Sequence, residues 1–118
     1  MTEKHPDGER VRRVGSNEAI FRAVNEEIQN LERGMSAVDE RTLHIVCECG
    51  RIDCTQQIAV PVAVYEGVRT HGDRFLIVPG HEIPDVESVV EEGPDFFVVR
   101  KDPGEPAAIA QRTDPRGD

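Results

Sequence analysis

The sequence predicts an α+β fold, in which a small antiparallel sheet with a cysteine-rich hairpin tip is packed by an N-terminal helix and a second short helix. Three observations lead to this prediction. A helical apolar pattern comes first and is followed by several short β-branched segments. Glycine and proline separate those segments. All three cysteines of the chain lie within eight residues, directly after the first strand-like segment.

The composition is that of one small domain. The chain has 118 residues, 37% of them hydrophobic, with four Phe, one Tyr and no Trp. Such a chain has room for one modest aliphatic core, and a core of this size often needs a disulfide or a metal ion as a staple. We expect a disordered arm over residues 1–15, a single α+β domain over 16–102 and a loosely ordered tail over 103–118.

The N-terminal helix is predicted over about residues 17–33. Ser16 offers an N-cap oxygen, and Gly34 follows the last apolar position. The spacing of the apolar residues places them on one helix face, which we expect to pack against the core. These residues are Ile20, Phe21, Val24, Ile28 and Leu31.

The remaining elements are short. Pro61 suits the first turn of a helix, and the Gly-Pro-Asp run at 93–95 suits a hairpin loop, although 85–92 is also compatible with a short helix. The predicted elements are a strand pair over 42–47 and 55–60, a helix over about 61–70, a strand over 74–78, a second strand pair over 86–91 and 96–101, and a brief helix over 105–113.

The cysteine segment predicts a zinc knuckle. Cys47, Cys49 and Cys54 follow the pattern C-x-C-x4-C, and Gly50 allows the backbone amides to turn toward the sulfur atoms. A structural zinc site takes four ligands, usually thiolates with one or two imidazoles. A fourth ligand must therefore come from elsewhere in the chain.

His81 is the predicted fourth ligand. It follows a strand end and the Pro79-Gly80 break, where a loop is able to reach back to the hairpin tip. The alternatives that stay open are His71 at a helix end, His44 on a strand, Asp53 within the knuckle, a water molecule, and a site without a fourth ligand. The predicted metal ligands are Cys47, Cys49, Cys54 and His81.

Other interpretations of the same residues remain. Free cysteines are often small buried hydrophobic residues, and the thiols also suit a redox role. Three cysteines and one histidine are similar to the ligand set of the CDGSH iron–sulfur family, which binds a [2Fe–2S] cluster. In that family the third cysteine and the histidine lie close together in sequence. Here 27 positions separate Cys54 from His81, which favours zinc.

Charge and composition argue against several functional classes. Asp and Glu number 23 and Lys and Arg 14, giving a formal charge of −9, which disfavours nucleic acid and anionic membranes as partners. No apolar run approaches the roughly 20 residues of a membrane span, and the N-terminus lacks the apolar region of a secretory signal. We therefore expect a cytoplasmic protein with reduced thiols. No catalytic motif is found, and no small-molecule substrate is indicated.

Six motifs, taken together, resemble a family of small, uncharacterised bacterial proteins, commonly of actinobacterial type. The resemblance covers about residues 17–101 and implies a compact bacterial domain. Its motifs are Asn25-Glu26-Glu27-Ile28, Cys47-Glu48-Cys49, Asp53-Cys54, Tyr65-Glu66-x-Val68-Arg69, Arg74-Phe75 and Pro79-Gly80-His81-Glu82.

The sequence thus predicts a non-enzymatic, zinc-stabilised module that acts through contacts with another protein. The alternative is a thiol-based redox sensor or a small [2Fe–2S] protein that uses the same ligands.

Overall fold

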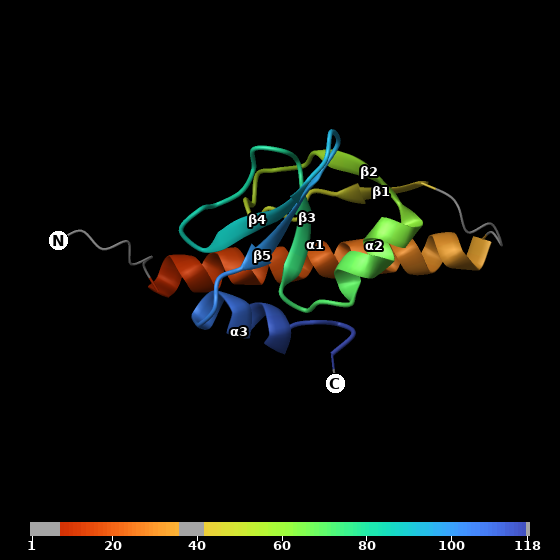
Figure 1. Ribbon diagram of the computed structural model, residues 1–118. Coiled ribbons are helices and arrows are strands. Elements are labelled where there is room, and N and C mark those ends of the chain that lie inside the picture. The colour runs from red at the N-terminus through yellow and green to blue at the C-terminus, as the bar shows by residue number, and fades with distance from the viewer. Residues whose placement is uncertain (1–7, 36–41, 118) are drawn as a thin grey trace.

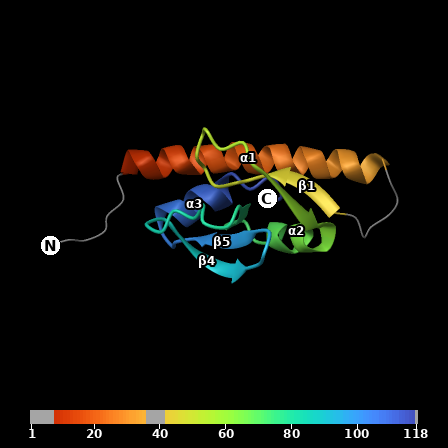
Figure 2. The same cartoon turned by 90° about the horizontal axis from the view of Figure 1, so that it is seen from above.

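The computed structural model describes residues 8–35 and 42–117 and shows an α+β fold. Helix α1 (Gly8–Met35) runs along one side of the molecule (Figure 1). Helices α2 (Val62–Arg69) and α3 (Glu105–Arg112) lie on the same side of α1 as the strands, as Figure 2 shows. The predicted fold class and its N-terminal helix are confirmed.

The strands form two small antiparallel sheets. Strands β1 (Thr42–Val46) and β2 (Gln57–Pro61) pair with Ile45 opposite Ile58, and the cysteine segment connects them. Strands β3 (Arg74–Ile77), β4 (Glu87–Glu92) and β5 (Phe97–Lys101) pair in the order β3-β5-β4. Both predicted strand pairs are therefore present, and the alternative of a short helix over 85–92 is wrong.

Alternation along the strands builds the main core. Leu43, Ile45, Ile58 and Val60 point inward from β1 and β2, while His44 and Ala59 between them are exposed. Tyr65 and Val68 of α2 join them, together with Phe75, Leu76 and Ile77 of β3. None of the helices in the described part of the chain has the length and apolar composition that crossing a membrane requires.

The structure corrects the predicted boundaries of the domain. Helix α1 begins at Gly8 and not near residue 17, so residues 8–15 are helical and Ser16 is an exposed residue inside the helix. The reason is that Val11 and Val14 are buried in a second cluster with Ile109 of α3. The predicted tail likewise contains α3, whose Ile109 and Ala110 are buried. Residues 1–7 lie outside the described part of the chain.

The predicted buried face of α1 is wrong. Ile20, Val24 and Leu31 are 54%, 41% and 64% exposed, and Phe21 and Ile28 are half-buried. The fully buried positions of this helix segment are polar instead, and they recur at spacings of four, three and four residues. They are Glu18, Arg22, Asn25 and Gln29.

These buried polar groups have partners from distant parts of the chain. Lys101 donates to Glu18 at 2.8 Å and to Glu87 at 2.9 Å. Arg22 donates to the carbonyl oxygens of Gly72 and Ala110, each at 2.8 Å, and lies over the Phe75 ring. A buried charge is tolerated when it is paired and hydrogen-bonded, so α1 joins the domain through polar contacts.

Candidate metal centre

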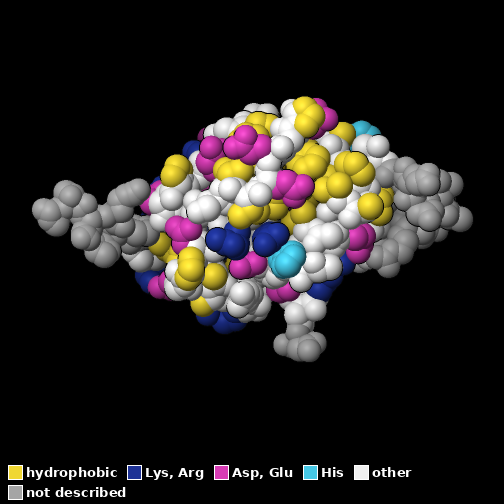
Figure 3. Space-filling model, in the orientation of Figure 1, with side chains coloured by type: hydrophobic (Ala, Val, Ile, Leu, Met, Phe, Trp, Pro, Cys, Tyr) yellow, Lys and Arg dark blue, Asp and Glu magenta, His cyan; other side chains and the backbone are white. Residues whose placement is uncertain are grey.

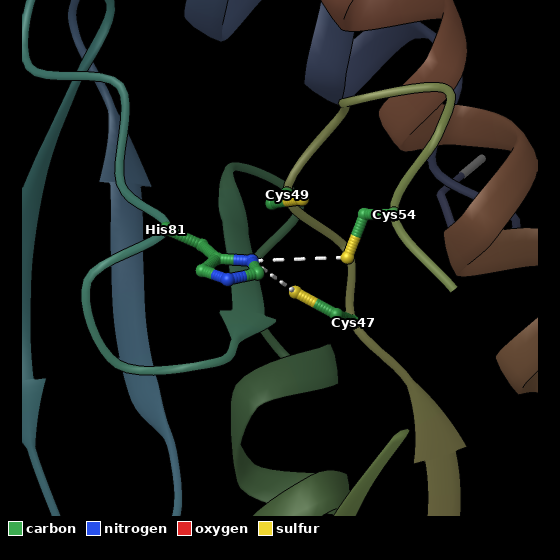
Figure 4. A group of neighbouring side chains, drawn as sticks. All are labelled: Cys47, Cys49, Cys54 and His81. Carbon is green, nitrogen blue, oxygen red and sulfur yellow. Dashed lines mark hydrogen bonds between the residues drawn. The ribbon is translucent and has the colours of Figure 1, made fainter. Parts of the chain in front are cut away.

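The four predicted metal ligands lie together at the tip of the β1–β2 hairpin. One donor atom from each of Cys47, Cys49, Cys54 and His81 lies within 4.8 Å of the other three (Figure 4). Cys47 and Cys49 are buried, whereas Cys54 and His81 are half-buried. The three cysteines are free thiols and come from the β1–β2 connection, and His81 comes from the loop after β3.

Backbone hydrogen bonds shape the cysteine segment. The amide of Cys47 donates to the Gln56 carbonyl and closes the hairpin, and the amide of Cys54 donates to the Arg51 carbonyl in a tight turn, both at 2.9 Å. Gly50 has φ +84°, and a Cβ atom there would lie 3.0 Å from Val14 and from Glu18. Glycine is therefore required both by the backbone angle and by the close approach to α1.

A second turn brings the imidazole to the sulfur atoms. The amide of His81 donates to the Val78 carbonyl at 2.9 Å across Pro79 and Gly80. Proline followed by a glycine of φ +91° is the pattern of a type II turn. This turn directs His81 back toward the knuckle, as its position after the Pro-Gly break had predicted (Figure 4).

Hydrogen bonds favour the thiolate form of Cys49. The bond from Cys47, the Arg51 amide and the contacts with His81 and Cys54 lower the pKa of Cys49 to about 5, although burial opposes this. The bond to Cys49 and burial raise the pKa of Cys47, so Cys47 keeps the proton that they share. The Val78 amide also donates to the Cys47 sulfur at 3.2 Å. Such amides offset the negative charge of metal-bound thiolates.

The spacing of the donors suits one tetrahedral ion. The Nδ1 atom of His81 lies 3.6 Å from the Cys47 sulfur and 3.7 Å from the Cys54 sulfur. A tetrahedral zinc ion with Zn–S of about 2.3 Å and Zn–N of about 2.0 Å has ligand atoms about 3.5–3.8 Å apart. The cluster is thus compatible with a metal site of four protein ligands.

The buried carboxylate of Glu48 anchors the knuckle by accepting hydrogen bonds from other elements. Glu48 is fully buried between two of the cysteines, and Arg69 of α2 donates two hydrogen bonds to it, at 2.9 and 2.8 Å. Asn25 of α1 donates to it at 2.6 Å and the Leu76 amide of β3 at 2.9 Å. Burial alone would lower the pKa of Arg69, but Glu48 more than offsets this and raises it. Three elements thereby hold the backbone between Cys47 and Cys49.

The other candidate ligands lie outside the cluster. His44, His71 and Asp53 are exposed, and none of them belongs to the group of four donors. The sequence did not identify Glu48 as an anchor of the knuckle, nor Asn25 and Arg69 as its partners. A signal for Asn25 was present in the sequence, because polar residues of α1 recur at helical spacing and form a second stripe beside the apolar one. This stripe consists of Glu18, Arg22, Asn25 and Gln29.

No protein-family model matches this chain, and neither curated proteins nor solved structures give a match. The family resemblance of the six sequence motifs therefore stays a prediction. A function for the chain has to be argued from the geometry of the cluster itself.

Proposed function

We propose that Cys47, Cys49, Cys54 and His81 hold one zinc ion in a structural site, and that the domain is a non-enzymatic module. The observation that carries this proposal is the spacing of the four donors, with imidazole-to-sulfur distances of 3.6 and 3.7 Å. These distances are close to the nitrogen-to-sulfur edge of a zinc tetrahedron, about 3.5 Å. The zinc would join the hairpin tip to the loop that follows β3.

The compactness of the cluster favours zinc over a [2Fe–2S] cluster. All four donor atoms lie within 4.8 Å of one another. In a [2Fe–2S] cluster the ligands are divided between two irons, so ligands of different irons lie farther apart than ligands of one ion. A set of donors that surrounds one point is better matched to a single ion.

A closed donor set supports a structural role. Catalytic zinc sites generally have three protein ligands and leave one position for water or substrate, whereas structural sites use four. With four protein donors the ion has no open position for chemistry. The activity we propose is therefore contact with another protein, through a surface whose shape depends on the knuckle.

The experiment is elemental analysis and native mass spectrometry of protein purified without an affinity tag. We expect one zinc per chain, loss of zinc in Cys54→Ser and His81→Ala, and retention in the matched controls His71→Ala and His44→Ala, whose side chains are exposed outside the cluster. Cobalt substitution should give the intense visible bands of tetrahedral thiolate coordination.

Four outcomes would overturn the proposal. Protein without metal, or full zinc occupancy in His81→Ala, would refute the four-ligand site. An iron–sulfur absorption spectrum would identify a cluster instead. Release of zinc by mild peroxide, with recovery after reduction, would indicate a thiol-based sensor in place of a purely structural site.

A further inference from the structure

A groove of about 360 Å³ lies between the first half of α1 and the outer side of the knuckle. It is distinct from the donor cluster, because its walls come from α1, from residues 50–52 and from Ile83. Figure 2 shows the β1–β2 connection crossing α1 at this place. Its volume is within the range of small-molecule sites, about 300–1,000 Å³.

The groove is basic on an acidic protein. Arg10, Arg13 and Arg51 line it, and no Asp or Glu of the described residues does, although Asp and Glu outnumber Lys and Arg by 23 to 14 in the chain. Acidic, basic and apolar side chains are interspersed on the face shown in Figure 3. Basic groups that converge on a concave surface attract anions.

Two of the three guanidinium groups are placed to meet a ligand. Arg10 is paired with Asp85, which holds it at the edge of the groove. Arg13 of α1 and Arg51 of the cysteine segment are exposed residues, and both line the groove. Guanidinium groups bind phosphate and carboxylate through paired hydrogen bonds.

Apart from Asn17 and Gly50, the rest of the lining is apolar, and a hydrogen bond joins α1 to the knuckle. Ile52 is 72% exposed at the rim, while Val14 and Ile83 are buried side chains at the wall. Asn17 of α1 donates to the Gly50 carbonyl at 3.0 Å and ties the two walls together. A ligand with an apolar group beside its anionic group would cover Ile52 and meet the arginines.

We propose that this groove binds a small organic anion, a phosphate monoester or a carboxylate that carries an apolar group. The two kinds of anion share one chemistry of recognition, namely charge-assisted hydrogen bonds from Arg13 and Arg51. The inference goes beyond the zinc site, because none of the four donor side chains lines the groove.

The test is a titration of the full-length, ¹⁵N-labelled protein, as purified with its metal, with phenyl phosphate, benzoate and inorganic phosphate. We expect saturable shifts of the amides of Asn17 and residues 50–52, with phenyl phosphate or benzoate binding more tightly than inorganic phosphate. The tighter of the two organic ligands would identify the preferred anion. The variant Arg13→Ala/Arg51→Ala should bind at least about tenfold more weakly.

The variant Arg112→Ala is the matched control, since Arg112 is an exposed arginine outside the groove, and it should bind like the parent protein. Absence of saturable shifts at millimolar ligand would overturn the proposal, and so would equal affinity in the double variant. Zinc content measured on the same samples separates failure of this proposal from failure of the zinc site.

Discussion

Replacement of Arg69 by methionine tests the anchoring of the knuckle. The methionine side chain would keep an apolar stem but remove both hydrogen bonds to Glu48, from a pair whose side chains are 1% and 0% exposed. The carboxylate would keep only Asn25 and the Leu76 amide as donors. Removing one partner of a buried ion pair costs about 3–5 kcal/mol, because the remaining charge is left desolvated. We expect Arg69→Met to lower the free energy of unfolding by this amount.

The measurement is urea unfolding, followed by far-ultraviolet circular dichroism at constant zinc concentration. Arg116→Met is the matched control, because Arg116 also binds carboxylates but is 30% exposed and pairs with Glu66, which is 37% exposed. Exposed pairs contribute about 1 kcal/mol or less. The slope of the transition with urea should stay the same in both variants if the surface exposed on unfolding is unchanged.

A second variant keeps the reasoning testable if Arg69→Met does not fold. The double variant Glu48→Gln/Arg69→Met carries no buried charge at this place, so it should be more stable than Arg69→Met alone. A loss below about 1 kcal/mol in Arg69→Met, or equal losses in Arg69→Met and Arg116→Met, would refute the view that burial makes this pair important.

Three further predictions test other parts of the fold. Burial raises the pKa of Glu18 to about 8, from 4.5, so the folded state holds a proton that the unfolded chain releases. The contribution of Glu18 to the free energy of unfolding should therefore fall as pH rises from about 4.5 to about 8. Urea titrations across this pH range should show that Glu18→Gln removes this pH dependence. A pH dependence like that of the parent protein would contradict the prediction. Gly50→Ala should destabilise by about 1–3 kcal/mol, whereas Gly67→Ala, in a helix with open space around it, should stabilise by about 0.5–1 kcal/mol; thermal melting distinguishes the two. Ile20→Gln should change stability by less than about 0.5 kcal/mol and Ile45→Ala should lower it by about 2–5 kcal/mol; equal effects would show that Ile20 is buried.

The donor cluster was predictable because its signals are local. Three cysteines in eight residues limit the site to one loop, and Pro79-Gly80 marks a turn directly before His81. The strands were predictable for a similar reason, since alternation of apolar and exposed residues appears within five positions in β1 and β2. Both kinds of signal are carried by residues that lie close together in the sequence.

The buried face of α1 was not predictable from such signals. Periodicity identifies two stripes on this helix, one apolar and one polar, but it does not say which one meets the domain. That choice depends on partners far along the chain, such as Lys101 for Glu18 and Ala110 for Arg22. The ends of the domain were missed for the same reason, because Val11 is buried in a cluster with Ile109, which lies far along the chain.

The knuckle is held on two sides, by the donor cluster and by Glu48, and removal of the metal should affect only the first of these. On the Glu48 side, the Glu48 amide donates to the Leu76 carbonyl, and the Leu76 amide donates to the Glu48 carboxylate. Neither hydrogen bond involves a residue of the donor cluster. On the cluster side, the Val78 amide is bonded to the Cys47 sulfur.

Chelation of zinc should therefore increase hydrogen exchange at Val78 and in the turn that ends at Cys54, while Glu48 and Leu76 stay protected. The variant His81→Ala, measured with zinc present, is the matched comparison and should show the same pattern, because it removes the link between the loop after β3 and the knuckle. Loss of protection at Glu48, Leu76 and the β1–β2 pairs together would contradict this. It would mean that the ion supports the whole core, and that the buried Glu48–Arg69 pair does not hold the backbone without it.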